Sequence, residues 1–72
     1  MAREHTILLL ECLECERASD LTVALMTSPG VTRVYVDTAT EAAFVEHHAD
    51  RVTRAQLARV VEGLGLRVRS MV

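Results

Sequence analysis

The order of strand-like and helix-like segments is the feature that most constrains how this chain of 72 residues folds. Four short stretches have the apolar or alternating pattern of β-strands, and they lie at residues 6–10, 31–37, 43–47 and 66–72. Two stretches with helical spacing separate them. The chain therefore reads as strand, helix, two strands, helix and strand, which restricts it to a small α+β fold.

Local signals mark the ends of the two predicted helices. The first is indicated by residues at helical spacing that stop before Pro29-Gly30, namely Leu21, Ala24, Leu25 and Ser28. The second begins at a capping box, in which Thr53 and Gln56 bond each other's backbone, and Gly65 ends it. Its apolar stripe is expected in the core: Leu57, Val60, Val61 and Leu64.

This order of elements is the split βαβ pattern of the ferredoxin-like fold. We expect a single domain over residues 1–72, with a four-stranded antiparallel sheet and two helices on one of its faces. That topology brings the loops at 11–19, 37–41 and 63–66 to one end of the sheet. The opposite end should collect His5, His47 and His48, which we expect on the surface; a second zinc site there is the less favoured reading.

Two cysteines, Cys12 and Cys15, stand three apart after the first predicted strand. A bridge between them would close too small a loop to stabilise the fold much, which favours a reducing, cytoplasmic compartment. Two sulfurs on one exposed loop suit a soft metal ion. Three other readings stay open: ordinary buried thiols, a CxxC thiol-disulfide redox protein, and a metal-free interaction module.

Within this framework the chain resembles the heavy-metal-associated (HMA) domain family, which comprises copper chaperones, mercury-binding proteins and the N-terminal modules of metal-exporting P-type ATPases. The residues behind the resemblance are the Cys12-x-x-Cys15 motif, Pro29-Gly30-Val31, Val34-Tyr35-Val36-Asp37, Val52-Thr53 with Leu57, and Leu64-Gly65. The resemblance implies a non-enzymatic domain that binds a heavy-metal ion and transfers it.

The sequence departs from the family pattern around the cysteines. Leu9 and Leu10 stand where the family has Gly and Met, and Leu66 stands where copper chaperones have Lys and ATPase modules an aromatic residue. A leucine can replace a buried methionine at a cost below about 1.5 kcal/mol, so the packing at Leu10 is expected to be kept. Leu10 and Leu66 are the residues expected to support the metal loop.

The spacing after the cysteines is also unusual, since Cys15 lies sixteen residues before Val31, about two more than in the family pattern. If the helix began at Cys15, that residue would lie across the helix from Leu21. We therefore predict a longer, looser metal loop and a helix that begins near Ser19 to Leu21, with Ser19 as N-cap.

Glu11, directly before the first cysteine, bears on which metal is bound. Two thiolates on Cu(I) already have a net negative charge, whereas two thiolates on a divalent ion are neutral and accept a carboxylate readily. We therefore predict a metal site of Cys12, Cys15 and Glu11 that favours Zn(II), Cd(II) or Pb(II) over Cu(I). Family members with an acid at this position resemble exporters of those divalent metals.

The charge distribution bears on the choice of partner. Through Asp50 the chain has nine acidic residues and three arginines, whereas from Arg51 onward it has one acidic residue and five arginines. An acidic rim at the metal end would attract a basic partner, and its expected members are Glu14, Glu16, Asp37 and Glu41. The net charge of −2 and the near absence of aromatic residues argue against nucleic acid as a partner.

The expected function is therefore that of an N-terminal metal-binding module of a Zn/Cd/Pb-type P-type ATPase, with a free-standing Cu(I) metallochaperone as the alternative. Its expected partners are the metal ion and either other domains of a metal-transporting ATPase or a metal chaperone. The apolar run at residues 7–10 is too short for a signal peptide or a membrane span. We expect a cytoplasmic domain that is monomeric without metal and does not insert into the membrane.

Overall fold

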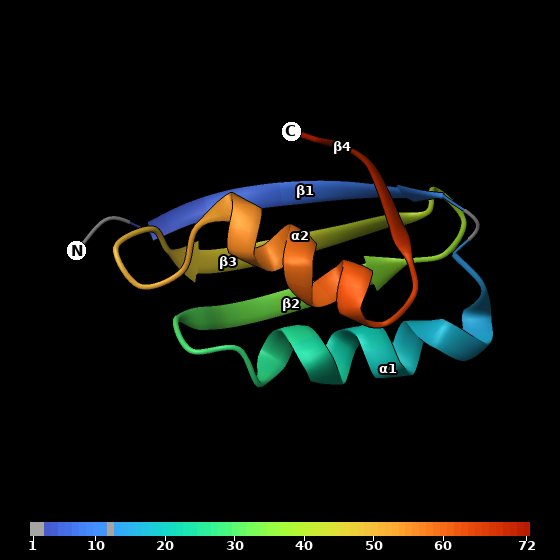
Figure 1. The fold of residues 1–72 in the computed structure, drawn as a ribbon, viewed down its shortest axis with the longest axis horizontal. Coiled ribbons are helices and arrows are strands. Elements are labelled where there is room, and N and C mark those ends of the chain that lie inside the picture. Colours follow the sequence, from blue (N-terminus) through green and yellow to red (C-terminus); the bar gives the residue numbers. More distant parts are fainter. Residues whose placement is uncertain (1–2, 12) are drawn as a thin grey trace.

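The computed structural model describes residues 3–11 and 13–72. It has one four-stranded antiparallel sheet in the order β2-β3-β1-β4, together with two helices (Figure 1). The elements along the chain are β1 (Arg3–Glu11), α1 (Cys15–Met26), β2 (Val31–Asp37), β3 (Ala42–His48), α2 (Arg54–Gly63) and β4 (Arg67–Met71). This confirms the ferredoxin-like α+β fold.

The core lies between the sheet and the two helices. Along β1, alternate residues Thr6, Leu8 and Leu10 are buried, because successive side chains of a strand point to opposite faces. Leu8 lies opposite Ala43 of β3 in the register, and both belong to the buried cluster. One face of the sheet is thus covered, which leaves the other face to solvent.

The second helix forms where the local signals place it. Thr53 accepts from the Gln56 amide at 3.2 Å, and the Gln56 side chain accepts from the Thr53 amide at 2.8 Å, so the predicted capping box is present. Of the predicted stripe, Leu57 and Val61 are fully buried, while Val60 and Leu64 are partly buried against the same cluster. In the part of the chain that the structure describes, neither helix has the length and apolar content needed to cross a membrane.

The start of the first helix differs from the prediction. It begins at Cys15 rather than near Ser19, with Glu14 as an extended N-cap residue, so the extra residues lengthen the helix and not the loop. The first turn is anchored from outside the helix, because the Arg17 guanidinium donates to the carbonyl oxygen of Leu64. Cys15 does face away from the core, but the helix can still begin there, because its first residue is exposed to solvent.

The prediction that all three histidines lie on the surface is wrong for His47, which is fully buried. Its Nδ1 lies 3.0 Å from the carbonyl oxygen of Val52, and its Nε2 lies 2.8 Å from Oγ1 of Thr6. Since a carbonyl only accepts, Nδ1 holds the proton and Nε2 accepts from the threonine hydroxyl. These two hydrogen bonds account for a polar side chain in the core.

Candidate metal-binding site

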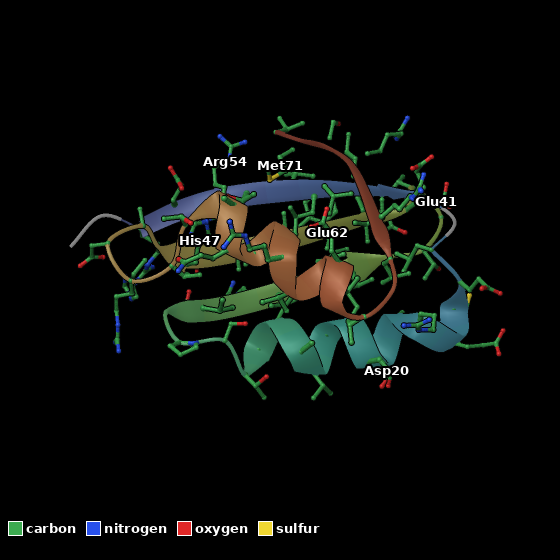
Figure 2. All side chains as sticks on the ribbon, in the orientation of Figure 1. Asp20, Glu41, His47, Arg54, Glu62 and Met71 are labelled. Atoms are coloured by element: carbon green, nitrogen blue, oxygen red, sulfur yellow. The ribbon has the colours of Figure 1, made fainter. Side chains whose placement is uncertain are left out.

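Three loops meet at the end of the sheet where β1 leads into α1, as the topology predicts. The Leu10 amide donates to the backbone oxygen of Glu41 at 2.8 Å, which joins the end of β1 to the β2–β3 hairpin. The Arg17 side chain reaches the carbonyl of Leu64 and so joins the head of α1 to the α2–β4 turn. Figure 2 shows Glu41 at this end and His47 at the opposite end of the sheet.

Cys15 is the described member of the predicted cysteine pair. It is a free, exposed thiol and the first residue of α1. Its Sγ donates to Oγ1 of Thr38, across a distance of 3.7 Å, so the thiol is held beside the β2–β3 hairpin. Cys12 lies outside the described residues.

Glu11, the predicted third ligand, is the last residue of β1 and is exposed. It lies opposite Arg67 of β4 in the antiparallel register. Together with Glu14, Arg17, Gly65 and Leu66 these two residues line a hollow of about 410 Å³ between the head of α1 and the α2–β4 turn. Glu11 therefore borders an open space with both acidic and basic walls.

The supporting residues Leu10 and Leu66 are 1% and 8% exposed, respectively. Leu10 belongs to the same buried cluster as the inner residues of both helices, and Leu66 joins that cluster from the turn before β4. Both leucines are therefore part of the packed core, where a side chain that supports the loop is expected to lie.

The four residues predicted as an acidic rim have different surroundings. Glu14 and Glu16 are exposed around Cys15, and the Asp37 carboxylate accepts from the Ala39 amide at 3.0 Å, within the hairpin. Glu41 is half-buried, and its carboxylate Oε2 accepts from the Leu13 amide at 3.0 Å. Glu41 therefore contacts the loop itself.

Two contacts of this end could not be read from the sequence, namely those of Thr38 and Arg17. No motif marks either residue, since each bonds a partner far along the chain: Cys15 for Thr38, and Leu64 for Arg17. In the described residues, no group of three or more histidine, cysteine or acidic side chains is arranged to hold a metal ion. The predicted ligand set includes Cys12 and so is not covered by that result.

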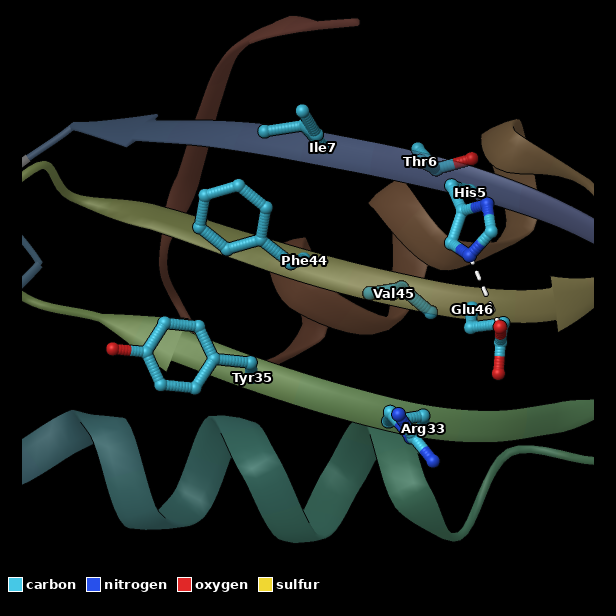
Figure 3. Close-up of a pocket in the computed structure, with 8 residues that line it drawn as sticks. All are labelled: His5, Thr6, Ile7, Arg33, Tyr35, Phe44, Val45 and Glu46. Carbon is cyan, nitrogen blue, oxygen red and sulfur yellow. Dashed lines mark hydrogen bonds and ion pairs between the residues drawn. The ribbon is translucent and has the colours of Figure 1, made fainter.

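Among the described residues, no histidine at the other end belongs to a group that could hold a metal ion. Both ring nitrogens of His47 are bonded, while the exposed His5 donates from Nε2 to the Glu46 carboxylate at 3.0 Å (Figure 3). Desolvation raises the pKa of Glu46, but the hydrogen bonds from His5 and Thr32 and the charge of Arg3 outweigh it and hold the pKa below its usual value.

The exposed face of the sheet has an apolar hollow of about 220 Å³ (Figure 3). Two aromatic rings, Tyr35 and Phe44, lie side by side in its wall with centroids 5.8 Å apart. Cross-strand aromatic pairs of this kind stabilise a sheet. The hollow lies on the face that the helices do not cover, and neither Glu11 nor Cys15 lines it.

No protein-family model matches the sequence, and neither does any curated protein. Solved structures do match. One described as "Crosstalk between Cu(I) and Zn(II) homeostasis" is 33% identical, with a TM-score of 0.81 over 92% of this chain and 96% of the other. The CopZ metallochaperone is 26% identical, with a TM-score of 0.84 over 93% of this chain and 98% of the other.

A third match is the water-soluble region of the P-type ATPase CopA from Bacillus subtilis, which is 25% identical with a TM-score of 0.86. It covers 93% of this chain and 45% of the CopA region. The likeness thus extends over nearly the whole of this sequence and includes the fold. The chain belongs to the heavy-metal-associated domain family.

Proposed function

We propose that this chain binds one heavy-metal ion through Cys12 and Cys15 and passes it to a partner protein by ligand exchange. The observation that supports this most directly is the position of Cys15, a free and exposed thiol at the head of α1 where three loops meet. Cys12 precedes it by three residues in the sequence, a spacing that suits two sulfurs on one soft ion. Membership of the HMA family points to the same chemistry.

The metal is cargo, and its transfer needs no change of oxidation state. Each thiol loses its proton as it binds the ion, so uptake releases protons to solvent. Two protein sulfurs leave the ion under-coordinated, and a thiolate from the partner can add before one of the original sulfurs leaves. The exposure of Cys15 supports this step because an incoming ligand needs access to the ion.

We further propose that the site prefers Zn(II), Cd(II) or Pb(II) over Cu(I), with Glu11 as the third ligand. Glu11 directly precedes Cys12 in the sequence, and its exposed side chain borders the hollow at the head of α1. A carboxylate on a divalent dithiolate site meets no net negative charge, whereas on a Cu(I) dithiolate it does.

The proposed setting is an N-terminal module of a metal-transporting P-type ATPase at the cytoplasmic face of a membrane. The CopA match supports it, since this chain corresponds to 45% of that soluble region. A free-standing metallochaperone is the second candidate, because CopZ is matched over 98% of its length. In either setting the exposed acids Glu14 and Glu16 beside Cys15 favour a partner with a basic surface.

Metal binding is tested by titrating the reduced protein with Cd(II) and following the ultraviolet absorption of cadmium–thiolate bonds. We expect saturation at one ion per chain, and loss of most of the signal in Cys12→Ser and in Cys15→Ser. An unchanged signal in either variant would contradict the assignment of the two sulfurs.

Metal preference is tested by competition titrations of Zn(II) and Cu(I) on the wild type, Glu11→Ala and Glu14→Ala. Glu14→Ala is the matched control, because it removes the same charge from the same end of the molecule. We expect Glu11→Ala alone to weaken Zn(II) binding, by about tenfold, while Cu(I) binding is unchanged or tighter. Equal effects of the two substitutions on Zn(II) would refute Glu11 as a ligand.

A further inference from the structure

The β2–β3 hairpin contacts the metal loop at two points, and both are side-chain contacts. The Glu41 carboxylate accepts from the amide of Leu13, the residue that directly follows Cys12 in the sequence. The Thr38 hydroxyl lies 3.7 Å from Sγ of Cys15. We call these two hairpin residues, Thr38 and Glu41, the hairpin clamp.

The backbone of Glu41 adds a third connection and shows an unfavourable conformation. Its carbonyl oxygen accepts from Leu10 at 2.8 Å, so Glu41 is bonded to residues on both sides of Glu11 and Cys12. Its φ of 54° lies in the left-handed region, and it is the only non-glycine residue with positive φ in the described chain. Glycine adopts this conformation without a steric penalty, whereas glutamate adopts it at a steric cost.

The side-chain contact gives a reason for a glutamate at this position. A glycine would suit the hairpin backbone better but has no side chain to reach Leu13. The glutamate is half-buried and accepts the amide at 3.0 Å, whereas an exposed rim residue would face solvent. Backbone strain together with a directed hydrogen bond is typical of functional positions.

We infer that Glu41 is a positioning residue for the metal loop, assisted by Thr38; this rests on the proposed function. The Leu13 amide, which lies between the two cysteines in the sequence, is held by Glu41 before metal arrives, so less ordering of this residue accompanies binding. When Cys15 binds as a thiolate it no longer donates, and the Thr38 hydroxyl then donates to the sulfur instead. The clamp thus acts on affinity through the conformation of the loop.

Four variants separate this role from a purely structural one. Glu41→Gly relieves the left-handed backbone but removes the acceptor, and Glu41→Gln removes the charge but keeps an acceptor oxygen of the same reach. Thr38→Val removes the hydroxyl with little change in volume, and Thr38→Ser restores it. Amide hydrogen exchange of Leu13 in the metal-free protein, affinity for Zn(II) by competition titration, and thermal unfolding are measured on each.

We expect Glu41→Gly to increase the exchange rate of the Leu13 amide and to weaken Zn(II) binding by about fivefold, as for the loss of one hydrogen bond. Its midpoint of thermal unfolding should stay the same or rise, because the strain is relieved. Glu41→Gln should match the wild type in both exchange and affinity. Thr38→Val should weaken Zn(II) binding by about two- to fivefold, and Thr38→Ser should restore it.

Unchanged Leu13 exchange and unchanged affinity in Glu41→Gly would overturn the inference. The inference would also be overturned if Glu41→Gly lost as much free energy of unfolding as free energy of Zn(II) binding, since Glu41 would then act only on the fold. If the wild type itself binds no metal, the proposed function fails and the positioning role with it. The exchange rate of Leu13 is measured without metal, so it still reports whether the hydrogen bond exists and distinguishes the two failures.

Discussion

Replacing His47 with phenylalanine removes both hydrogen bonds of the buried imidazole and puts a somewhat larger, apolar ring in its place. The Thr6 hydroxyl is itself fully buried and would lose its acceptor, and the carbonyl of Val52 would lose its donor. Each polar group left buried without a partner costs about 1–3 kcal/mol. The greater apolar area of phenylalanine offsets part of this, so we expect the free energy of unfolding to fall by about 2–4 kcal/mol.

A double-mutant cycle with Thr6→Val isolates the threonine–histidine bond. Thr6→Val alone removes the hydroxyl at 2.8 Å from Nε2 of His47 and leaves only the Glu4 carboxylate, at 3.6 Å, near that nitrogen, whereas in His47→Phe the same change removes an unpaired hydroxyl. The two substitutions together should therefore cost less than their sum, with a coupling energy of about 1–2 kcal/mol.

Urea denaturation followed by circular dichroism at pH 7 measures all four proteins. In a domain of this size, 1 kcal/mol corresponds to about 4–8 °C in Tm, so thermal scans give a second reading. Additive effects within about 0.5 kcal/mol would refute the reasoning that the two buried side chains depend on each other. Metal binding should survive in the folded variants, since Glu41 and His47 lie at opposite ends of the sheet (Figure 2).

Four further substitutions have defined outcomes. Because the pKa of Glu46 is lowered in the fold, its stabilising effect is present above its usual pKa of 4.5 and is lost as the pH falls through the lowered value. Urea midpoints of Glu46→Gln should therefore fall less steeply with acid than those of the wild type; parallel profiles would contradict this. Gly30→Ala should destabilise by about 2 kcal/mol, since its φ is +91° and a Cβ would lie 2.8 Å from Cβ of Arg51. Gly65→Ala should cost only about 1 kcal/mol, because its φ is +86° but a Cβ there would meet no atom within 4 Å apart from its chain neighbours. Equal losses of stability for the two glycine variants in urea denaturation would refute the steric part of this comparison. Leu10→Met should change the free energy of unfolding by less than about 1.5 kcal/mol and leave Zn(II) affinity as it is; a larger loss would show that the pocket around Leu10 has been reshaped.

The parts of the fold that depend on neighbouring residues could be predicted from the sequence. The capping box of Thr53 and Gln56 involves residues three apart. The second helix ends before Gly65, as predicted, and Gly65 has a positive φ. The order of the strands follows from the order of the segments. The convergence of three loops at the head of α1 follows in turn from that topology.

The parts that depend on distant contacts could not be predicted. The start of α1 at Cys15 is supported by a bond from Arg17 to Leu64, a residue at the end of the other helix. The alternation of β3 does place His47 on the same face as the buried Val45. The expectation of an exposed histidine was wrong because its partner Thr6 lies 41 residues away and gives no local signal.

The cysteine pair and Glu11 of the candidate site could be proposed from the sequence, whereas the contacts around them could not. The pair of cysteines and Glu11 are visible as a motif, and the structure places Cys15 and Glu11 at the end where the loops meet. Glu41, which accepts from the Leu13 amide, has a left-handed backbone that glutamate rarely adopts. No composition rule indicates such a position.

Native mass spectrometry of the reduced protein tests the central claim most directly. The wild type and Cys12→Ser/Cys15→Ser are each mixed with Zn(II), Cd(II) or Cu(I), and the mass of the folded chain is read. We predict a mass shift of one metal ion per chain in the wild type, and none in the double variant at equal folding by circular dichroism. No shift in the wild type, or the same shift in both proteins, would contradict a metal carrier that acts through these two thiols.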